Sequence, residues 1–233
     1  MTQPESSNSD LVIWTFDFAL TTFFEIESKL IEPLLPSQLS LMEVSPGIGL
    51  INVTAFNFPG GALGELPEFQ ELILSAIVPP DLSRGVPKFA IYVLNLTSTC
   101  QEHLDHSADY YKLPVFEKMT KANVDKNKIA LDYGDESGKI LTMQNCGNNM
   151  HFDSEDRYFQ VFTSDGDDLT IANCTIKASL HEHQESGNVG KLHNHPFFLG
   201  IDMKDVEPVE YLQMVGEPGK LGKQHYYRPE KYN

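Results

Sequence analysis

The chain has 233 residues, of which 41% are hydrophobic, and its 16 glycines and 14 prolines are spread along its length. This composition predicts one compact domain with a substantial core. Thirty-three acidic against 17 basic residues give a formal net charge of −16, which repels nucleic-acid phosphates and anionic membrane surfaces. We therefore expect neither nucleic acid nor a membrane as a partner.

The sequence has no predicted targeting or membrane-spanning segment. The first 20 residues lack a basic stretch followed by an apolar one, and no run of about 18 apolar residues is present. We expect a soluble, cytoplasmic protein. Cys100, Cys146 and Cys174 show no CxxC spacing, which favours reduced structural thiols over disulfides or a zinc site.

The N-terminal third begins with a predicted disordered tail, residues 1–10, which has almost nothing apolar to bury. Residues 10–24 are dense in β-branched and aromatic side chains and predict a strand. Residues 26–35 place apolar side chains on one helical face, and Pro36 follows, so we expect a helix that ends there.

The remaining elements are mostly predicted strands joined by turns. Apolar segments at 47–58, 72–78 and 89–94 predict strands, and polar residues 100–111 predict a short helix. Residues 216–233 are rich in glycine and proline and are expected to form a C-terminal surface arm or an oligomer contact. From residue 126 onward the pattern is that of hairpins, with turns at 134–138, 164–167 and 185–188.

Many short strands with turns about every ten residues predict a closed antiparallel β-barrel with a few short helices, a mainly β (α+β) fold. We assign this barrel to residues 11–215. The interior of such a barrel is a dry central pocket.

Several stretches of the chain occur in an order that resembles the acetoacetate decarboxylase superfamily. One of them is Ser107-Ala108-Asp109-Tyr110-Tyr111-Lys112-Leu113, and Glu71 lies in an aromatic-x-Glu segment that begins at Phe69. The other stretches that carry the resemblance are 23–36, 63–78, 131–134, 139–143, 171–183 and 191–198.

The resemblance implies a barrel enzyme that forms a Schiff base between Lys112 and a carbonyl substrate. Glu71 takes the place of the family's active-site glutamate and would act as general acid or base. A catalytic lysine must be neutral to attack a carbonyl, which requires a desolvated pocket or a neighbouring cation. Tyr110 or Tyr111 would orient the carbonyl oxygen. The family implies a lyase without a cofactor, assembled as a homo-oligomer.

Departures from the family pattern change the expected substrate. In acetoacetate decarboxylase, the standard example of this effect, a second lysine follows the Schiff-base lysine and lowers its pKa. In this sequence Leu113 takes the place of that second lysine. A family glutamate falls at Asn52, and the arginine that meets the substrate carboxylate falls near Asp17. A neutral ketone, aldehyde or polyketide-like molecule then fits better than a β-keto acid. We expect aldol, dehydration or cyclisation chemistry beside decarboxylation, in secondary metabolism.

Three alternatives stay open at this point. Lys88, in Gly85-Val86-Pro87-Lys88-Phe89, is a competing candidate lysine. A second reading is a non-covalent barrel that binds or cyclises an apolar molecule, its pocket lined by some of Phe56, Phe58, Leu63, Leu66, Phe197 and Phe198.

The third alternative is a metal site. His181 and His183, and likewise His193 and His195, are two residues apart, so each pair would share one face of a strand and offer two imidazoles to one ion. His103 and His106, on the polar segment before Lys112, are expected to be solvated.

Overall fold

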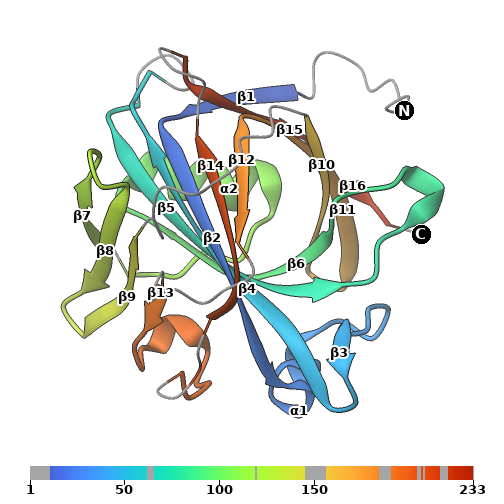
Figure 1. The fold of residues 1–233 in the computed structure, drawn as a ribbon. Helices are drawn as coiled ribbons and strands as arrows, with labels where there is room; N and C mark the ends of the chain where they lie inside the picture. Colours follow the sequence, from blue (N-terminus) through green and yellow to red (C-terminus); the bar gives the residue numbers. More distant parts are fainter. Residues whose placement is uncertain are drawn as a thin grey trace.

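The computed structural model describes residues 11–61, 66–118, 120–144, 156–183, 190–203, 206, 208–215 and 220–232, with the backbone alone at 181–183, 210–213 and 215. Most of these residues lie in two β-sheets (Figure 1). The larger sheet contains β1 (Leu11–Phe16), β2 (Phe18–Glu27), β3 (Glu43–Ser45), β4 (Ile48–Phe58), β5 (Phe69–Val78), β6 (Ala90–Ser98), β10 (Arg157–Asp165), β11 (Asp168–Lys177), β12 (Ser179–His183), β14 (Pro208–Val215), β15 (Gly222–Tyr227) and β16 (Glu230–Lys231).

The smaller sheet and the helices complete the described chain. Its strands are β7 (Lys121–Asp125), β8 (Ala130–Asp135), β9 (Gly138–Gln144) and β13 (Gly190–Leu192). The two α-helices are α1 (Ser28–Ile31) and α2 (Gln101–Tyr111), and 3-10 turns lie at Glu32–Leu34, Leu82–Arg84 and Pro196–Phe198. The longest of the described helices, α2, has 11 residues and is too short to cross a bilayer.

The large sheet runs in the order β1-β15-β11-β10-β6-β5-β4-β2-β14-β12. It is strongly curved, with β2, β4 and β5 on one side and β10 and β11 on the other (Figure 1). Within the described ranges β1 and β12 end this path and do not pair, so the expected barrel is not closed by hydrogen bonds. All pairings along the path are antiparallel except β6 with β10, which is parallel.

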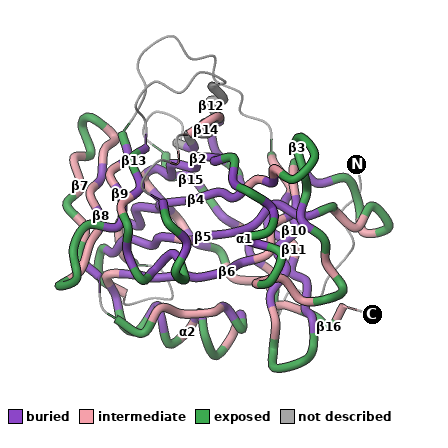
Figure 2. Tube along the Cα trace, turned by 90° about the horizontal axis from the view of Figure 1, so that it is seen from below, coloured by how far each residue is buried: buried purple, intermediate pink, exposed green. Residues whose placement is uncertain are grey.

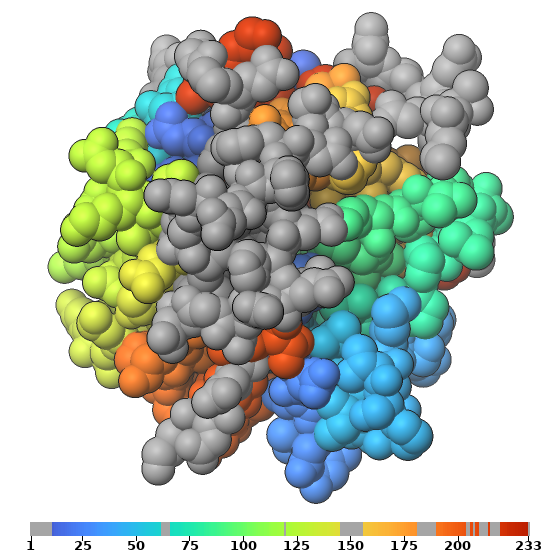
Figure 3. Space-filling model, viewed as in Figure 1, coloured from blue at the N-terminus to red at the C-terminus, as the bar shows by residue number. Residues whose placement is uncertain are grey.

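Each central strand divides its side chains between two packed regions, because successive residues of a strand point to opposite faces. On β4, Ile51 and Val53 pack against the small sheet, in a core that includes Leu131 and Tyr133 of β8. The alternate residues of β4, among them Phe56, face the inner core of the large sheet. The small sheet forms one flank of the molecule, opposite the green loop that contains Leu82–Arg84 (Figure 3).

Helix α2 lies beside β6, along the lower edge of the molecule in Figure 2. Its buried residues, His103, Leu104, Ser107 and Tyr111, lie on one helical stripe. The helix ends at Lys112, which adopts a left-handed conformation with φ 57°. The predicted helix at 100–111 is therefore present, with one face in the core.

The predicted helix at 26–35 is largely wrong. Strand β2 continues through Ile26, which pairs with Gly49 of β4, and only Ser28–Ile31 is α-helical. Pro33, which has no N–H to donate, converts the next turn to 3-10 geometry. Pairing with β4 thus outweighs the helical periodicity of this segment.

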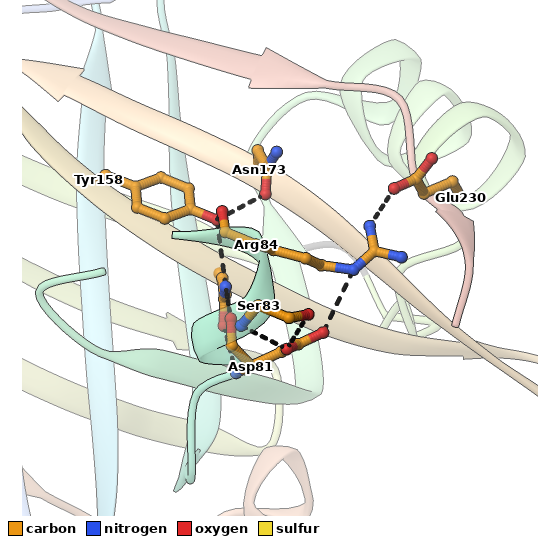
Figure 4. Close-up of polar contacts among 7 residues, drawn as sticks. Asp81, Ser83, Arg84, Tyr158, Asn173 and Glu230 are labelled. Atoms are coloured by element: carbon orange, nitrogen blue, oxygen red, sulfur yellow. Dashed lines mark hydrogen bonds and ion pairs between the residues drawn. The ribbon is translucent and has the colours of Figure 1, made fainter. Parts of the chain in front are cut away.

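Within the predicted C-terminal arm, residues 222–227 and 230–231 are strands of the large sheet. Strand β15 pairs with both β1 and β11, and β16 pairs with β11. Figure 4 shows how the end of the chain is held: Arg84 makes ion pairs with Asp81 and with Glu230 of β16. The guanidinium of Arg84 also lies over the ring of Tyr232.

Candidate active site

A cavity of about 80 Å³ lies between the inner face of the large sheet and α2. Its wall is mainly aromatic and aliphatic, as in most small-molecule sites. It is lined by Trp14, Thr21, Asn52, Thr54, Phe56, Phe58, Glu71, Ile73, Phe89, Ile91, Val93, His103, Ser107, Tyr111, Leu113, Phe159, Val161, Cys174, Ile176, Met214, Gln224 and Tyr226.

The cavity contains a buried carboxylate–imidazole pair, Glu71 of β5 and His103 of α2. Oε2 of Glu71 lies 3.1 Å from Nε2 of His103, and their side chains are only 7% and 3% exposed. Nδ1 of His103 has no hydrogen-bond partner among the described residues. A carboxylate that holds one imidazole nitrogen leaves the other free for proton transfer, so this arrangement is suited to acid–base chemistry.

Aromatic rings hold the imidazole of His103 in place. The ring of Trp14 meets it edge-on, with centroids 5.2 Å apart, and the ring of Phe69 lies against it at 4.5 Å. Phe69 itself is fully buried and is not part of the cavity wall. The predicted pocket residue Phe69 therefore supports the imidazole from behind.

Asn52 and two threonines form the polar part of the wall on β2 and β4. The amide of Asn52 donates to Oγ1 of Thr54 at 3.2 Å, and the hydroxyls of Thr54 and Thr21 are 2.9 Å apart. Oδ1 of Asn52 has no partner within the described part of the chain. Asn52 thus lines the cavity with one acceptor atom available to a ligand.

Two tyrosines and a tryptophan form a second polar group in the cavity. The indole Nε1 of Trp14 donates to the hydroxyl of Tyr111 at 3.0 Å. The rings of Tyr111 and Tyr226 meet edge-on with centroids 4.3 Å apart. Burial raises the pKa of both phenols, and the nearby carboxylate of Glu71 adds to the increase. Both tyrosines are therefore neutral phenols.

Lys112 does not have the desolvated environment that the sequence analysis expected. The residue is exposed and is not part of the cavity wall, whereas its neighbours Tyr111 and Leu113 are. Its left-handed backbone ends α2 and reverses the chain, and its carbonyl accepts a hydrogen bond from Thr163 at 2.7 Å. No lysine or arginine is among the described residues that line the cavity.

The other predicted site residues lie outside the cavity wall. Tyr110 stacks on His106 under the guanidinium of Arg228. Asp17 lies between β1 and β2, where its carboxylate accepts from Asn57 at 2.8 Å and forms an ion pair with Lys126 at 3.0 Å.

The structure also shows where the competing lysine and most of the proposed apolar lining residues lie. Lys88 is exposed and is not part of the cavity wall. Phe56 and Phe58 line the cavity, whereas Phe197 and Phe198 belong to the core beneath the small sheet. Leu66 packs against the inner core, and Leu63 lies outside the described residues.

The structure gives no support to the histidine metal site. Nε2 of His195 lies 2.9 Å from Asp135, and its Nδ1 accepts from the backbone N–H of Phe197, so both ring nitrogens are engaged. His193 follows β13 in the small sheet, and the side chains of His181 and His183 lie outside those described. No group of three metal-binding side chains occurs within the described ranges.

The sequence analysis missed His103, Ser107 and Tyr226. His103 was expected to be solvated but is 2% exposed. The spacing of His103, Ser107 and Tyr111, which is four residues each time, was the available signal that one helical stripe would face the interior. Nothing local to Tyr226 indicates that β15 inserts between β1 and β11.

Comparison with known proteins finds similar solved structures but no similar sequence family. No family model and no curated protein match the sequence. Acetoacetate decarboxylase from Legionella pneumophila superposes with a TM-score of 0.61 and 12% identity, covering 100% of this chain and 92% of that one. An acetoacetate decarboxylase-like enzyme from Sphingomonas wittichii gives 0.57 and 10%, covering 100% and 99%.

A third solved structure is the enduracididine biosynthesis enzyme MppR, complexed with the condensation product of pyruvate and imidazole 4-carboxaldehyde. It superposes with a TM-score of 0.62 at 7% identity, covering 99% of this chain and 90% of that one. These similarities extend over nearly the whole of both chains and agree with the resemblance seen in the sequence. The chain therefore has the acetoacetate decarboxylase-like fold.

Proposed function

We propose that this protein is an enzyme that acts on a small, uncharged carbonyl compound by proton transfer, without a lysine imine. The observation that carries the proposal is the buried Glu71–His103 pair, 3.1 Å apart, in a cavity whose described wall has no lysine or arginine. The solved structures with this fold include a decarboxylase and MppR, which support a carbonyl substrate by analogy of fold.

In the proposed reaction the Glu71–His103 pair takes a proton from the carbon next to the carbonyl group. The C–H electron pair becomes the C=C bond of an enolate, and the carbonyl oxygen takes up the negative charge. The pair then returns the proton to the same carbon, to another carbon or to a departing hydroxyl group. Return of the proton to carbon gives isomerisation, and its return to a departing hydroxyl group gives dehydration with loss of water. In cyclisation the enolate carbon attacks a second carbonyl group of the same molecule, and the pair protonates the alkoxide that forms.

The charge of the cavity argues against a β-keto acid. A substrate carboxylate would enter a mainly apolar cavity that already holds Glu71 and, in the described wall, offers no cation to pair with it. An unpaired charge in such surroundings costs several kcal/mol of desolvation, which a neutral ketone avoids. We therefore favour reactions of neutral carbonyl compounds over decarboxylation of a β-keto acid.

The test is exchange of solvent deuterium into the carbon next to the carbonyl group, followed by proton NMR over a panel of neutral ketones and 1,3-diketones. We expect Glu71→Gln and His103→Asn each to slow the exchange by about 10²–10⁴-fold. Glu117→Gln, which changes an exposed carboxylate outside the cavity wall, is the matched control. Exchange that survives both cavity variants in folded protein would exclude the pair as the acid–base group.

The lysine imine is tested in the same samples. Borohydride is added together with acetylacetone, pyruvate or a simple aldehyde, and the intact mass is measured. The proposal expects no reduced adduct. An adduct that maps to Lys112, next to the cavity residues Tyr111 and Leu113, would overturn it in favour of the Schiff-base mechanism implied by the family resemblance.

A further inference from the structure

We propose that the hydroxyl groups of Tyr111 and Tyr226 form a binding site for the carbonyl oxygen of a neutral aromatic or conjugated ketone. This inference rests on the proposed function, since it names the substrate class of the same cavity. Tyr111 comes from α2 and Tyr226 from β15, and both side chains line the cavity.

The hydrogen bond from Trp14 leaves the hydroxyl proton of Tyr111 free to be donated to a ligand. Because Nε1 of Trp14 donates to the hydroxyl oxygen at 3.0 Å, that oxygen is the acceptor and its own proton remains available. Tyr111 is 3% exposed, so the proton is not directed into bulk water. An incoming carbonyl oxygen would accept it.

Tyr226 supplies the second donor. Its side chain is 6% exposed, and its hydroxyl has no hydrogen-bond partner among the described residues. Leaving a buried hydroxyl unpaired is destabilising, so such a group in a cavity wall points to a ligand that pairs with it. The rings of the two tyrosines meet edge-on with centroids 4.3 Å apart, so both phenols belong to the same part of the cavity wall.

The surroundings keep both groups as donors. Burial is the largest cause that raises the pKa of each phenol; for Tyr111 it outweighs the hydrogen bond from Trp14, which lowers the pKa. A neutral phenol donates to a carbonyl oxygen, and it donates more strongly to the enolate oxygen that develops when the neighbouring carbon loses its proton. The two hydroxyls would therefore stabilise the charged intermediate of the proposed reaction.

The rest of the wall fits a flat, apolar body attached to the carbonyl. Phe56, Phe58, Phe89 and Phe159 contribute four further rings to the cavity. Aromatic walls bind aromatic and conjugated molecules through apolar contact and ring stacking. An anionic ligand of the same shape would be repelled by Glu71 and would find no partner cation in the described wall.

Trp14 gives a direct reporter, because it is the single tryptophan of the chain and lines the cavity. The experiment titrates its fluorescence with acetophenone, with benzoate, which has a similar shape but is anionic, and with ethylbenzene, which lacks the oxygen. We expect acetophenone to bind more tightly than the other two. Tyr226→Phe should weaken acetophenone about tenfold, the loss of one hydrogen bond, and leave ethylbenzene unchanged.

Tyr227→Phe is the matched control, since it removes a phenol from the adjacent residue of β15, outside the cavity wall. Equal binding of benzoate and acetophenone, or unchanged acetophenone affinity in folded Tyr226→Phe, would overturn the inference. The titrations measure equilibrium binding and need no turnover. Selective ketone binding without deuterium exchange would therefore refute the proposed function alone, and exchange without phenol-dependent binding would refute this inference alone.

Discussion

The imidazole of His195 lies 2.9 Å from the carboxylate of Asp135, and both side chains are almost fully shielded, at 1% and 2% exposure. This pair joins the turn between β8 and β9 to the 3-10 turn Pro196–Phe198, because Nδ1 of His195 also accepts from the N–H of Phe197 at 3.2 Å. Although burial raises the pKa of Asp135, hydrogen bonds from His195 and Ser137 outweigh it, and the net pKa is below the ordinary value.

We expect acid to remove this stabilisation. A carboxyl group with a lowered pKa in the folded state stabilises the protein above its unfolded-state pKa, near 4, and the stabilisation is lost as the pH falls toward the lower folded-state value. Asp135→Asn should reduce the free energy of unfolding by about 2 kcal/mol at pH 7. Urea denaturation should show this deficit shrinking below about pH 4. A deficit of the same size at pH 7 and pH 3 would contradict the assignment, and Asp167→Asn, an exposed aspartate, is the control.

Replacing Lys112 by glycine should stabilise the protein. Lys112 has φ 57° at the end of α2, a conformation that glycine adopts without the penalty of a side chain. Lys112→Gly is expected to raise the free energy of unfolding by about 0.5–1 kcal/mol and to leave deuterium exchange unchanged. Thermal and urea denaturation measure the first effect. Loss of exchange in a stabilised variant would show that the amine takes part in the reaction after all.

The loop before Leu82–Arg84 depends on Gln160 more than on Arg84. The side-chain amide of Gln160, which is fully buried, accepts from the N–H of Asp81 and donates to its carbonyl, both at 2.8 Å. Gln160→Leu leaves these two groups unpaired and should cost about 2–4 kcal/mol of unfolding free energy.

Arg84→Gln removes the surface ion pairs with Asp81 and Glu230 drawn in Figure 4, and should cost less than about 1 kcal/mol. Urea denaturation of the two variants gives the comparison. The opposite order of the two costs would show that the ion pairs hold this loop.

Cys174 should resist alkylation in the native protein. Burial raises the pKa of its thiol to about 12, so the reactive thiolate is scarce at pH 8. We expect iodoacetamide to label Cys174 about a thousandfold more slowly in the folded than in the unfolded protein. Peptide mass spectrometry at timed intervals measures the two rates. Comparable rates would mean that the cavity opens freely to solvent.

Local patterns predicted many of the elements correctly. The strand expected at 47–58 is β4, and the turns at 134–138 and 164–167 join β8 to β9 and β10 to β11. Sheet order was not predictable in this way. The parallel contact of β6 with β10 and the insertion of β15 join residues far apart in the chain, and no local signal reports such pairings.

Some residues of the candidate site were likewise predictable from the sequence, and others were not. Resemblance to the family directed attention to Glu71, Asn52 and Tyr111, and all three line the cavity. It also pointed to Lys112, whose orientation depends on one left-handed backbone residue that periodicity does not reveal. His103 looked solvated because its helix is polar, but Glu71 of β5 and the rings of Trp14 and Phe69, which are distant in the sequence, surround it in the core. Cytoplasmic location and homo-oligomer formation stay predictions.

The cavity wall combines residues that lie far apart in the sequence. Trp14 lies on β1 and Tyr226 on β15, and these two strands pair along their whole length, from Leu11 with Tyr227 to Phe16 with Gly222. During synthesis the wall therefore stays incomplete until residue 227 has left the ribosome, because β1 cannot pair with β15 before then. A nascent chain halted before that point would carry Glu71 and His103 but would lack the wall that encloses them, so ligand binding would report that β15 has joined the sheet.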